Sequence, residues 1–460
     1  MGAYPAYTSY TPTSCKWFPE IPAHWSIDRA KWSVSACQNG IWGAEPSGDD
    51  DLACIRVADF DRQSLRVSTE KLTMRGIEAK ERRNRLLETG DLLLEKSGGG
   101  EQQLVGAVVE FNQSFPAVSS NFIARMVACK EVNSRFLVYV HSHLYAGRVN
   151  YRSIKQTTGI QNLDSQAYLD ELIAYPPHDE QQTIARFLDF KTAQIDALIA
   201  KKQTLLDKLA EKRTALISHA VTKGLDPQVK MKDSGVAWLG QIPAHWKMTR
   251  LKYATSMIVD CPHDTPEYSD EGGYLVVRTA NLVQGKMDLS QAYRVEEDEY
   301  RHRVRRAVVR PDDILYGREG ERWGFAATVP GHPVVCLGQR MMQFRAGTHF
   351  HSRFLMWHLN ADCVYQQGAL DTSGSTAPHV NVETIKNYWL VEPRSDEQVR
   401  IADFLDRASN RLDEQFARAK QAIEKLQEYR SALITNAVTG KIDVRGFQIP
   451  IATNQELSHV

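Results

Sequence analysis

Two long stretches of the chain place apolar residues every seven positions. Residues from about 180 to 221 contain neither proline nor glycine, and mixed charges such as Lys201, Asp207 and Glu211 lie between the apolar positions. A repeat of seven with a second apolar row is typical of an α-helix that packs against another helix. A second stretch near the C-terminal end has the same pattern. The predicted seam consists of Leu188, Ile195, Ile199, Leu206, Leu209 and Leu216 in the first helix, and of Leu405, Leu412, Phe416, Ile423, Leu426 and Leu433 in the second.

A helix of about 42 residues is roughly 63 Å long, and it cannot bury an apolar stripe by itself. Because the two predicted helices are alike, we expect them to run antiparallel and to bury their stripes against each other as an intramolecular coiled coil. The alternative is that each helix packs only on its own globular domain.

The chain also repeats itself over more than 200 residues. IPAHW occupies residues 21–25 and returns at residues 242–246, and the two helix copies begin with DEQ at Asp179 and Asp396, 217 positions apart. A period of this length indicates duplicated domains and not a solenoid of short repeats. The shared parts are therefore expected to be framework, and the diverged parts are expected to carry the working surface.

The stretches between the shared elements predict two compact domains of mixed α/β class. Short β-rich runs, helical pieces and glycine turn signals alternate in both, as in residues 104–111, 135–145 and 98–100 of the first. Each domain has about 150 residues, an ordinary size. We expect a pseudo-two-fold chain with an N-terminal segment (1–25), domain 1 (26–178), a central helix and linker (179–246), domain 2 (247–395), a C-terminal helix (396–446) and a tail (447–460).

Positive charge gathers at matching positions of the two domains. Four or five cations within ten residues repel one another, and neutralisation of nucleic-acid phosphates is one reason for such clustering. The alternative is a solvated loop balanced by nearby glutamates, but the recurrence in two diverged copies favours phosphate contact. The candidates are Lys80, Arg82, Arg83 and Arg85 in domain 1, and Arg301, Arg303, Arg305 and Arg306 in domain 2.

Two polar loops in each domain add further candidates. Glycines in a loop let the backbone come close to a ligand, and Gln and Arg side chains suit base edges. The first loop contributes Lys96, Ser97, Gln102 and Gln103 in domain 1, and Arg318 and Arg322 in domain 2; the second contributes Thr157 and Thr158, and Ser373 and Ser375. Hydroxyls of the second loop could hold phosphates or cap a helix, and the first loop could be a plain hairpin connection.

Composition narrows the class of protein. In 460 residues no apolar run approaches the roughly 20 needed to span a bilayer, and the start of the chain lacks the features of a signal peptide. Seven scattered cysteines without a CxxC pair predict reduced, mostly buried thiols in a cytoplasmic protein, and no metal site is expected. A net charge of zero neither favours nor excludes nucleic acid, because local patches decide that.

Motifs for catalysis are missing from the sequence, so no catalytic residue is expected. No GxxxxGK[ST] loop for nucleotide phosphates occurs. The run 175–178 is only faintly similar to an amino-group methyltransferase motif and is expected to be a rigid linker, with Asp179 and Asp396 as helix N-caps. His24 and His245 are expected to have a framework role beside a packed tryptophan.

Taken together, these motifs resemble the specificity subunit of a type I restriction-modification system. The carriers are WLGQIPAHW at residues 238–246, its copy WFPEIPAHW at 17–25, the DEQ helix that ends in Ala-Val-Thr in both copies, and the duplication itself. The resemblance covers nearly the whole chain, from about residue 4 to 446.

The resemblance implies that domains 1 and 2 are target recognition domains, each reading one half of a bipartite asymmetric site in double-stranded DNA. It implies that the helices set the separation of the domains and dock two methyltransferase subunits and, through them, restriction and motor subunits. Such a complex methylates adenine at N6 with S-adenosylmethionine and cleaves DNA with ATP and Mg²⁺, and neither activity lies in this subunit. Two other functions compete: a self-contained adenine methyltransferase, and a coiled-coil adaptor without a nucleic-acid role.

Overall fold

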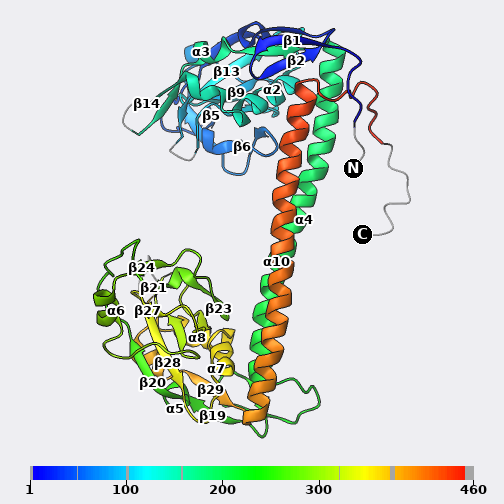
Figure 1. Ribbon diagram of the computed structural model, residues 1–460. Coiled ribbons are helices and arrows are strands. Elements are labelled where there is room, and N and C mark those ends of the chain that lie inside the picture. The colour runs from blue at the N-terminus through cyan, green and yellow to red at the C-terminus, as the bar shows by residue number, and fades with distance from the viewer. Residues whose placement is uncertain are drawn as a thin grey trace. The chain divides into compact units, whose positions relative to one another are not determined.

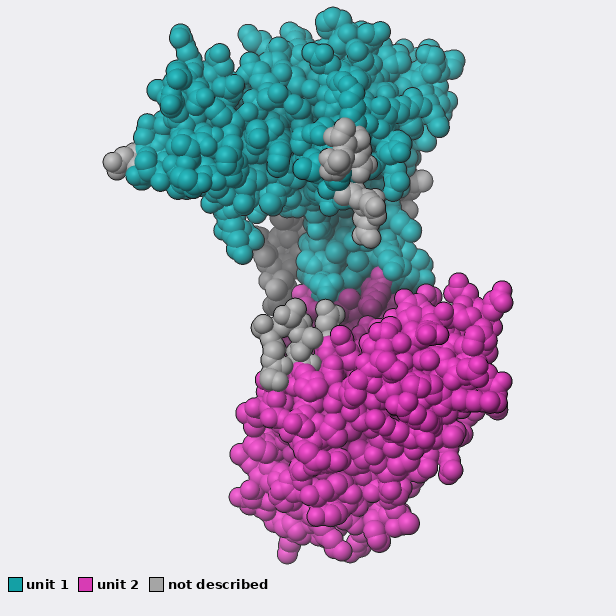
Figure 2. Space-filling model, turned by 90° about the vertical axis from the view of Figure 1, so that its left-hand side faces the viewer, with its two compact units in different colours: residues 1–203, 421–460 teal, residues 204–420 magenta. Residues whose placement is uncertain are grey.

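The computed structural model describes residues 4–48, 50–99, 103–156, 159–320, 322–372 and 379–450. It divides into unit 1, residues 1–203 and 421–460, and unit 2, residues 204–420 (Figure 2). Each unit contains a β-rich domain and a part of each of two long helices, α4 (His178–Lys223) and α10 (Ser395–Val438). The expected mixed α/β fold with two long packed helices is confirmed. The unit division cuts both helices in the middle, whereas the predicted domain boundaries separate only the first residue of each helix from the rest. Those boundaries stay a prediction.

Domain 1 is built on a six-stranded sheet with the order β4-β13-β9-β11-β7-β6, and on a three-stranded sheet with the order β12-β5-β8. Its centre is β9 (Leu92–Glu95), which is buried along its whole length and lies antiparallel to both neighbours. Such a strand is apolar at successive positions because both of its faces are covered. The other strands of these two sheets are β4 (Val34–Asn39), β5 (Asp51–Ile55), β6 (Phe60–Asp61), β7 (Arg66–Val67), β8 (Thr73–Gly76), β11 (Val108–Glu110), β12 (Ala117–Ser119) and β13 (Ile123–Ala128).

Smaller elements complete unit 1. They are β1 (Tyr10–Cys15), β2 (Phe18–Pro22), β3 (Ser26–Arg29), β10 (Ser97–Gly98), β14 (Ile154–Gln156), β15 (Gln161–Leu163), β16 (Leu172–Tyr175), α1 (Ala79–Arg82), α2 (Ser134–Ala146) and α3 (Ser165–Leu169).

Domain 2 repeats the core topology of domain 1. Its four-stranded sheet, β20-β28-β25-β26, matches β4-β13-β9-β11, and its three-stranded sheet, β24-β21-β27, matches β8-β5-β12. The elements of unit 2 are β17 (Met231–Asp233), β18 (Gln241–Pro243), β19 (Lys247–Arg250), β20 (Thr255–Asp260), β21 (Tyr274–Val277), β22 (Leu282–Val283), β23 (Lys286–Met287), β24 (Tyr293–Val295), β25 (Ile314–Gly317), β26 (Ala326–Thr328), β27 (Val335–Leu337), β28 (Met341–Ala346), β29 (Trp389–Glu392), α5 (Leu251–Ala254), α6 (Glu297–Arg303), α7 (Ser352–Leu359), α8 (Asp362–Ala369) and α9 (Val382–Lys386).

The long helices have 46 and 44 residues, slightly more than the sequence predicts. Within each unit they lie side by side and antiparallel (Figure 1). In unit 1 the start of α4 meets the end of α10, and Leu188, Ile195 and Leu433 share one apolar cluster. In unit 2 the end of α4 meets the start of α10, and Leu405 and Leu216 share another. Both clusters also include residues of the domain in that unit, so each helix packs on its partner helix and on a domain.

The predicted seam is largely apolar but not entirely so. Leu206, Leu209 and Leu412 are buried, Ile199 and Leu426 are partly buried, and Phe416 and Ile423 are of intermediate burial. Thr192, Arg213 and Ser409 are buried polar residues of the same helices that the heptad pattern does not predict. Thr192 and Ser409 are 217 positions apart, so this departure from an apolar seam is itself duplicated.

The shared IPAHW and DEQ motifs contact each other in both units. In unit 1 the buried Glu180 carboxylate accepts hydrogen bonds from Trp25 Nε1 at 3.1 Å and from Tyr7, and lies 2.8 Å from His24 Nε2. In unit 2 the Glu397 carboxylate lies 2.9 Å from His245 Nε2 and accepts a hydrogen bond from Trp246 Nε1 at 3.5 Å. The two histidines therefore fix the start of each long helix, which supports the framework interpretation.

The predicted N-caps are wrong. Helix α4 begins at His178, so Asp179 is its second residue, and the carbonyl of Pro177 accepts from Glu180 N at 2.9 Å. Helix α10 begins at Ser395, which likewise places Asp396 inside the first turn. The aspartates still favour the helix start, because negative charge is stabilised near the positive end of the helix dipole.

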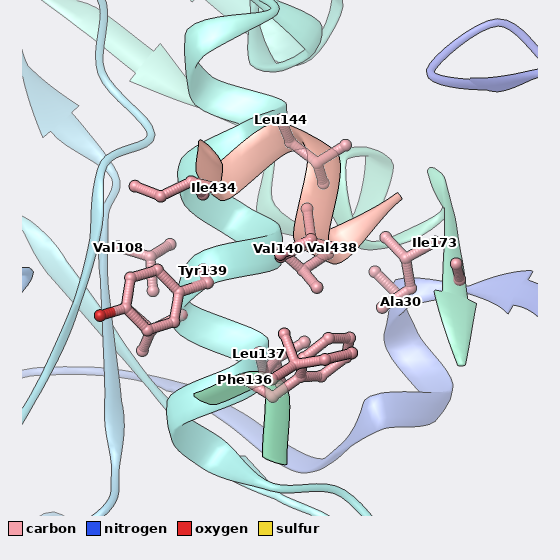
Figure 3. Close-up of a cluster of buried hydrophobic side chains, with 14 of the residues drawn as sticks. Ala30, Val108, Phe136, Leu137, Tyr139, Val140, Leu144, Ile173, Ile434 and Val438 are labelled. Carbon is pink, nitrogen blue, oxygen red and sulfur yellow. The ribbon is translucent and has the colours of Figure 1, made fainter. Parts of the chain in front are cut away.

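The largest apolar cluster of unit 1 joins the domain to the helices. Figure 3 shows Val140 and Leu144 of α2 close to Ile434 and Val438 of α10, and Phe136 of α2 belongs to the same cluster. Burying a side chain of this size stabilises a fold by about 1.5–3 kcal/mol. Helix α2 therefore takes part in the apolar connection between domain 1 and α10.

All seven cysteines are free, and five of them are buried. Among the helices of the described residues, none combines the length and apolarity that a membrane crossing requires.

Candidate nucleic-acid interface

The basic segment of domain 1 lies at and after the short helix α1. Lys80 forms an exposed ion pair with Glu78, and Arg83 is exposed. Arg82 donates to the carbonyl of Ile77 at 2.7 Å and pairs with Asp50 at 2.8 Å, and this hydrogen bond lowers the pKa of Asp50. Arg85 donates to the carbonyl of Glu81 at 3.4 Å. Arg82 is therefore committed to holding α1, whereas Lys80 and Arg83 present their charge to solvent.

The basic segment of domain 2 lies at and after helix α6, and one of its four candidates is interior. The Arg303 side chain has 0% exposure and donates to Glu299 at 2.6 Å and to the carbonyl of Asp264 at 3.0 Å. Arg301 is exposed and paired with Glu297 at 2.6 Å. Arg305 and Arg306 are exposed, and Arg306 donates to the carbonyl of Asp260 at 2.9 Å. Arg303 thus holds α6 in place, and we leave it out of the candidate surface.

Local charges around α6 keep Asp264 ionised. Burial alone would raise the pKa of its carboxyl group, but the hydrogen bond from His302 at 2.8 Å and the charge of Arg303 outweigh burial and lower the pKa. Asp264 therefore offsets part of the positive charge of this segment, and Arg305 and Arg306 are exposed cations for which no carboxylate partner is found among the described residues.

The first polar loop follows the central strand of each domain, β9 or β25. Lys96 donates to Asn39 Oδ1, at the end of β4, at 2.6 Å. Arg318 pairs with Asp260, at the end of β20, at 3.5 Å, and with Glu319 at 2.7 Å. In both domains a cation that follows the central strand thus binds a side chain at the end of the corresponding neighbouring strand, β4 or β20, although the residue types differ. Since Arg318 is buried, it shapes this loop more than it faces solvent.

In each domain the first polar loop contacts described residues that follow the second polar loop in the sequence. In domain 1, Ser97 pairs with Asn162 in the β10–β15 ladder and its hydroxyl donates to Asn162 Oδ1 at 2.6 Å. In domain 2, Glu319 bridges to His379, whose Nδ1 lies 2.8 Å from the Glu319 carboxylate. We call each pair a loop edge: residues 96–99 with 161–163 in domain 1, and 318–320 with 379 in domain 2. The sequence does not reveal this pairing, because a tertiary contact joins segments more than 55 residues apart.

The remaining candidates lie beside the loop edges or outside the described residues. The Gln103 side-chain oxygen, in its hydrogen-bonded orientation, accepts from Arg62 Nε at 3.0 Å. Arg322 donates to the carbonyls of Ala280 at 2.7 Å and Leu282 at 3.0 Å, so it supports its own loop. Gln102, Thr157, Thr158, Ser373 and Ser375 lie outside the described residues.

Four aspartates with clear roles are missing from the predicted site. Asp189 and Asp196 on α4, and Asp406 and Asp413 on α10, bind side chains of the domain in the same unit. The sequence does contain a signal for them: the two aspartates of each pair are seven residues apart, and the second pair repeats the first at an offset of 217. Their partners could not be predicted, since these come from distant segments.

The arrangement of possible metal ligands among the described residues bears on the expectation that the chain holds no metal site. Within the described ranges, no group of three or more His, Cys, Asp or Glu residues is placed to hold a metal ion. The polar groups at the loop edges bind one another and the strand ends, an arrangement suited to contact with a ligand.

Comparison with known proteins gives the same family that the sequence motifs resemble. The family described as "Type I restriction modification DNA specificity domain" matches residues 263–425. The specificity subunit of the type I restriction enzyme MjaVIII of Methanocaldococcus jannaschii is 23% identical over 300 residues, which are 64% of this chain and 67% of that protein. The EcoBI specificity subunit of Escherichia coli is 26% identical over 227 residues, 47% of each protein, so the match spans less than half of that relative.

A solved structure shares the fold over nearly the whole chain. It is described as the "Structural basis underlying complex assembly and conformational transition of the type I R-M system" and has a TM-score of 0.67 at 13% identity, covering 92% of this chain and 99% of that one. The duplicated domains and the shared helices define a protein of two similar modules. The chain is similar to the specificity subunits of type I restriction-modification systems, and residues 263–425 match the DNA specificity domain of that family.

Proposed function

We propose that domains 1 and 2 are target recognition domains, each of which reads one half of a bipartite, asymmetric site in double-stranded DNA. The observation that carries the proposal is the duplication: domain 2, most of which lies in the matched DNA specificity domain, shares its sheet order with domain 1. A common framework with different loops suits two readers of the same polymer. It does not suit one enzyme active site, which needs a single constellation of groups.

The loop edges support different half-sites. Domain 1 carries Lys96, Ser97 and Asn162 at its edge, whereas domain 2 carries Arg318, Glu319 and His379. Amide and hydroxyl groups can both donate to and accept from base edges, whereas a carboxylate only accepts. The two edges therefore favour different donor and acceptor patterns in the major groove.

The exposed cations support a contact with phosphates. Lys80 and Arg83 in domain 1, and Arg305 and Arg306 in domain 2, carry charge in solvent close to each domain's second sheet. Phosphate contacts position a protein on DNA without reading its sequence. Each domain then has a positioning segment and a reading edge.

In this proposal the helices dock two methyltransferase subunits and, through them, the restriction and motor subunits. S-adenosylmethionine, ATP and Mg²⁺ act in those partners. The assembled complex methylates adenine at N6, and with the motor subunits it cleaves unmodified DNA.

The experiment incubates a randomised DNA library and labelled S-adenosylmethionine with the chain alone, with the methyltransferase subunit alone, and with both. We expect methylation at one bipartite sequence only when both are present. Methylation by the chain alone would favour a self-contained methyltransferase. Complex formation without any DNA binding, at low salt, would favour an adaptor.

A further inference from the structure

Each long helix carries two aspartates one heptad apart. They are Asp189 and Asp196 on α4, and Asp406 and Asp413 on α10, and each of the first pair lies 217 positions before its counterpart. Seven residues make almost two helical turns, so both carboxylates of a pair lie on one face, about 10 Å apart. This face is turned toward the domain of the same unit, as the following contacts show.

The first aspartate of each pair binds the first helix after the central sheet. In unit 1, Asp189 Oδ1 accepts from Arg135 Nε at 2.7 Å and from the Tyr139 hydroxyl at 2.6 Å, both on α2. In unit 2, Asp406 accepts from Arg353 and, at 2.7 Å, from Trp357 Nε1, both on α7. An arginine and an aromatic side chain four residues apart thus bind the same carboxylate in both domains.

The second aspartate joins the other long helix and a hairpin of the domain. In unit 1, Asp196 accepts from Arg430 Nε at 3.0 Å and from Gln63 Nε2 at 2.9 Å, and Arg430 also donates to the Gln63 carbonyl. Gln63 lies in the turn between β6 and β7.

Unit 2 has the same arrangement with the helices exchanged. Asp413 on α10 accepts from Arg213 on α4 and from Lys286 in the β22–β23 hairpin, and Lys286 also donates to Asn410 Oδ1 at 2.6 Å. Arg213 and Arg430 are 217 positions apart, so the Arg–Asp pair is duplicated together with the helices.

These contacts are partly shielded from water. The side chains of Arg430 and Asp196 are 14% and 22% exposed, and those of Arg213 and Asp413 are 9% and 35% exposed. Burial alone would raise the pKa of Asp413, but the hydrogen bonds from Arg213 and Lys286 outweigh burial and lower the pKa. Charge-assisted hydrogen bonds in such surroundings are stronger than exposed surface pairs.

Two attachments fix a domain better than one. The apolar clusters hold each domain against the helices through contacts without a preferred direction, whereas two charge-assisted hydrogen-bonded contacts two helical turns apart fix its angle. We propose that these four aspartates are positioning residues: they hold each recognition domain at a fixed angle on the helix pair, and so restrict the number of base pairs allowed between the two half-sites. This inference rests on the proposed function.

The test measures tolerance to the gap between half-sites. The complex of the full chain with its methyltransferase subunit is given DNA in which the two half-sites are separated by the native gap or by one base pair more or fewer. We compare the wild-type chain, the double variant Asp406→Asn with Asp413→Asn, and the control Glu383→Gln. The control removes a charge on α9 of domain 2, away from the long helices, where the side chain is 69% exposed.

We expect the wild-type chain and the control to methylate only DNA with the native gap. We expect the double variant to raise the ratio of methylation at the altered gaps to methylation at the native gap about tenfold, because the charge-assisted hydrogen bonds of both carboxylates are weakened together. The bases required in each half-site should not change. An unaltered gap preference in a folded double variant would overturn the proposal.

Two further variants separate positioning from stability. Lys286→Gln leaves the Arg213–Asp413 pair intact and changes a side chain that is 46% exposed, so it keeps the fold and should still relax the gap. In unit 1, Asp196→Arg should relax the gap, and adding Arg430→Asp should restore it, because the pair is then reformed in reverse. If Lys286→Gln and Asp196→Arg lower only the melting temperature, the residues stabilise the fold without positioning. If the wild-type complex requires no bipartite site, the proposed function itself fails, and this inference fails with it.

Discussion

At the scale of single residues, arginine serves two purposes in this chain. Arg303 and Arg213 are buried and bind carboxylates of their own unit, whereas Arg305 and Arg306 are exposed. The two groups differ in what removal would do. Loss of a buried cation leaves its carboxylate partner unpaired and costs folding free energy, whereas loss of an exposed cation changes only the field that DNA meets.

The first prediction concerns the exposed pair. Arg305→Ala with Arg306→Ala should weaken DNA binding by the complex and lower the salt slope of the binding constant by about two, because each lost phosphate contact reduces the slope by roughly 0.9. The measurement is a titration at several salt concentrations, with Arg400→Ala on the exposed face of α10 as the control. An unchanged slope would contradict the phosphate role.

The second prediction concerns a buried histidine. His358 is fully buried, its Nε2 accepts from Val391 N at 3.2 Å, and burial lowers its pKa from 6.5 to about 4. Between those values the unfolded chain binds the proton and the folded chain does not. Stability should therefore fall as the pH drops from 6.5 toward 4, by roughly 3 kcal/mol in total for this group.

The corresponding measurement is the free energy of unfolding of the wild type and of His358→Gln at about pH 7, 5.5 and 4.5. The variant keeps a hydrogen-bond acceptor but cannot titrate, so its stability should fall less steeply with acid. A constant difference between the two proteins at all three pH values would refute this assignment.

At the scale of elements, each long helix starts at a carboxylate that binds the IPAHW motif. Glycines close the other end: Gly224 and Gly440 have φ of +79° and +72° and lie against Trp246 and Trp25. A side chain at either position would strain the backbone and meet the tryptophan ring. In each unit, the start of one long helix and the glycine after the end of the other long helix thus contact the same copy of the IPAHW motif.

The third prediction compares the two helix starts. Glu180→Gln should lower the free energy of unfolding more than Glu397→Gln, since the Glu180 side chain is 6% exposed and that of Glu397 is 21% exposed. Weakening hydrogen bonds to a buried charged group costs about 1.5–3 kcal/mol. Denaturant unfolding of both variants, with Glu424→Gln on the exposed surface of α10 as the control, gives the comparison; the reverse order would contradict the role of burial.

The sequence predicts the elements well where the pattern is local or duplicated. The heptad pattern predicts α4, α10 and most of their seam, and the IPAHW repeat predicts the framework histidines. The sequence does not show that Arg303 is buried and Arg305 is exposed, because their burial depends on how the chain folds around α6. It also misses Asp189 and Asp196, since their partners on α2 and in the β6–β7 turn come near them only after folding.

At the scale of the whole molecule, duplication gives the chain two domains with one topology and different loop edges. In each unit the domain is held to both long helices by an apolar cluster and by the duplicated aspartates. A domain built in this way should be exchangeable as a module, because its contacts with the helices come from the shared framework and its reading groups come from the diverged loops.

Exchange of domain 2 tests the central claim most directly. Residues 247–392 are replaced by the corresponding residues of a related specificity subunit with a known half-site, and the adenines methylated by each complex are located by sequencing. The account predicts that one half-site takes the sequence read by the donor and that the other half-site stays as in the wild type. A change in both half-sites, or in neither, would contradict the account.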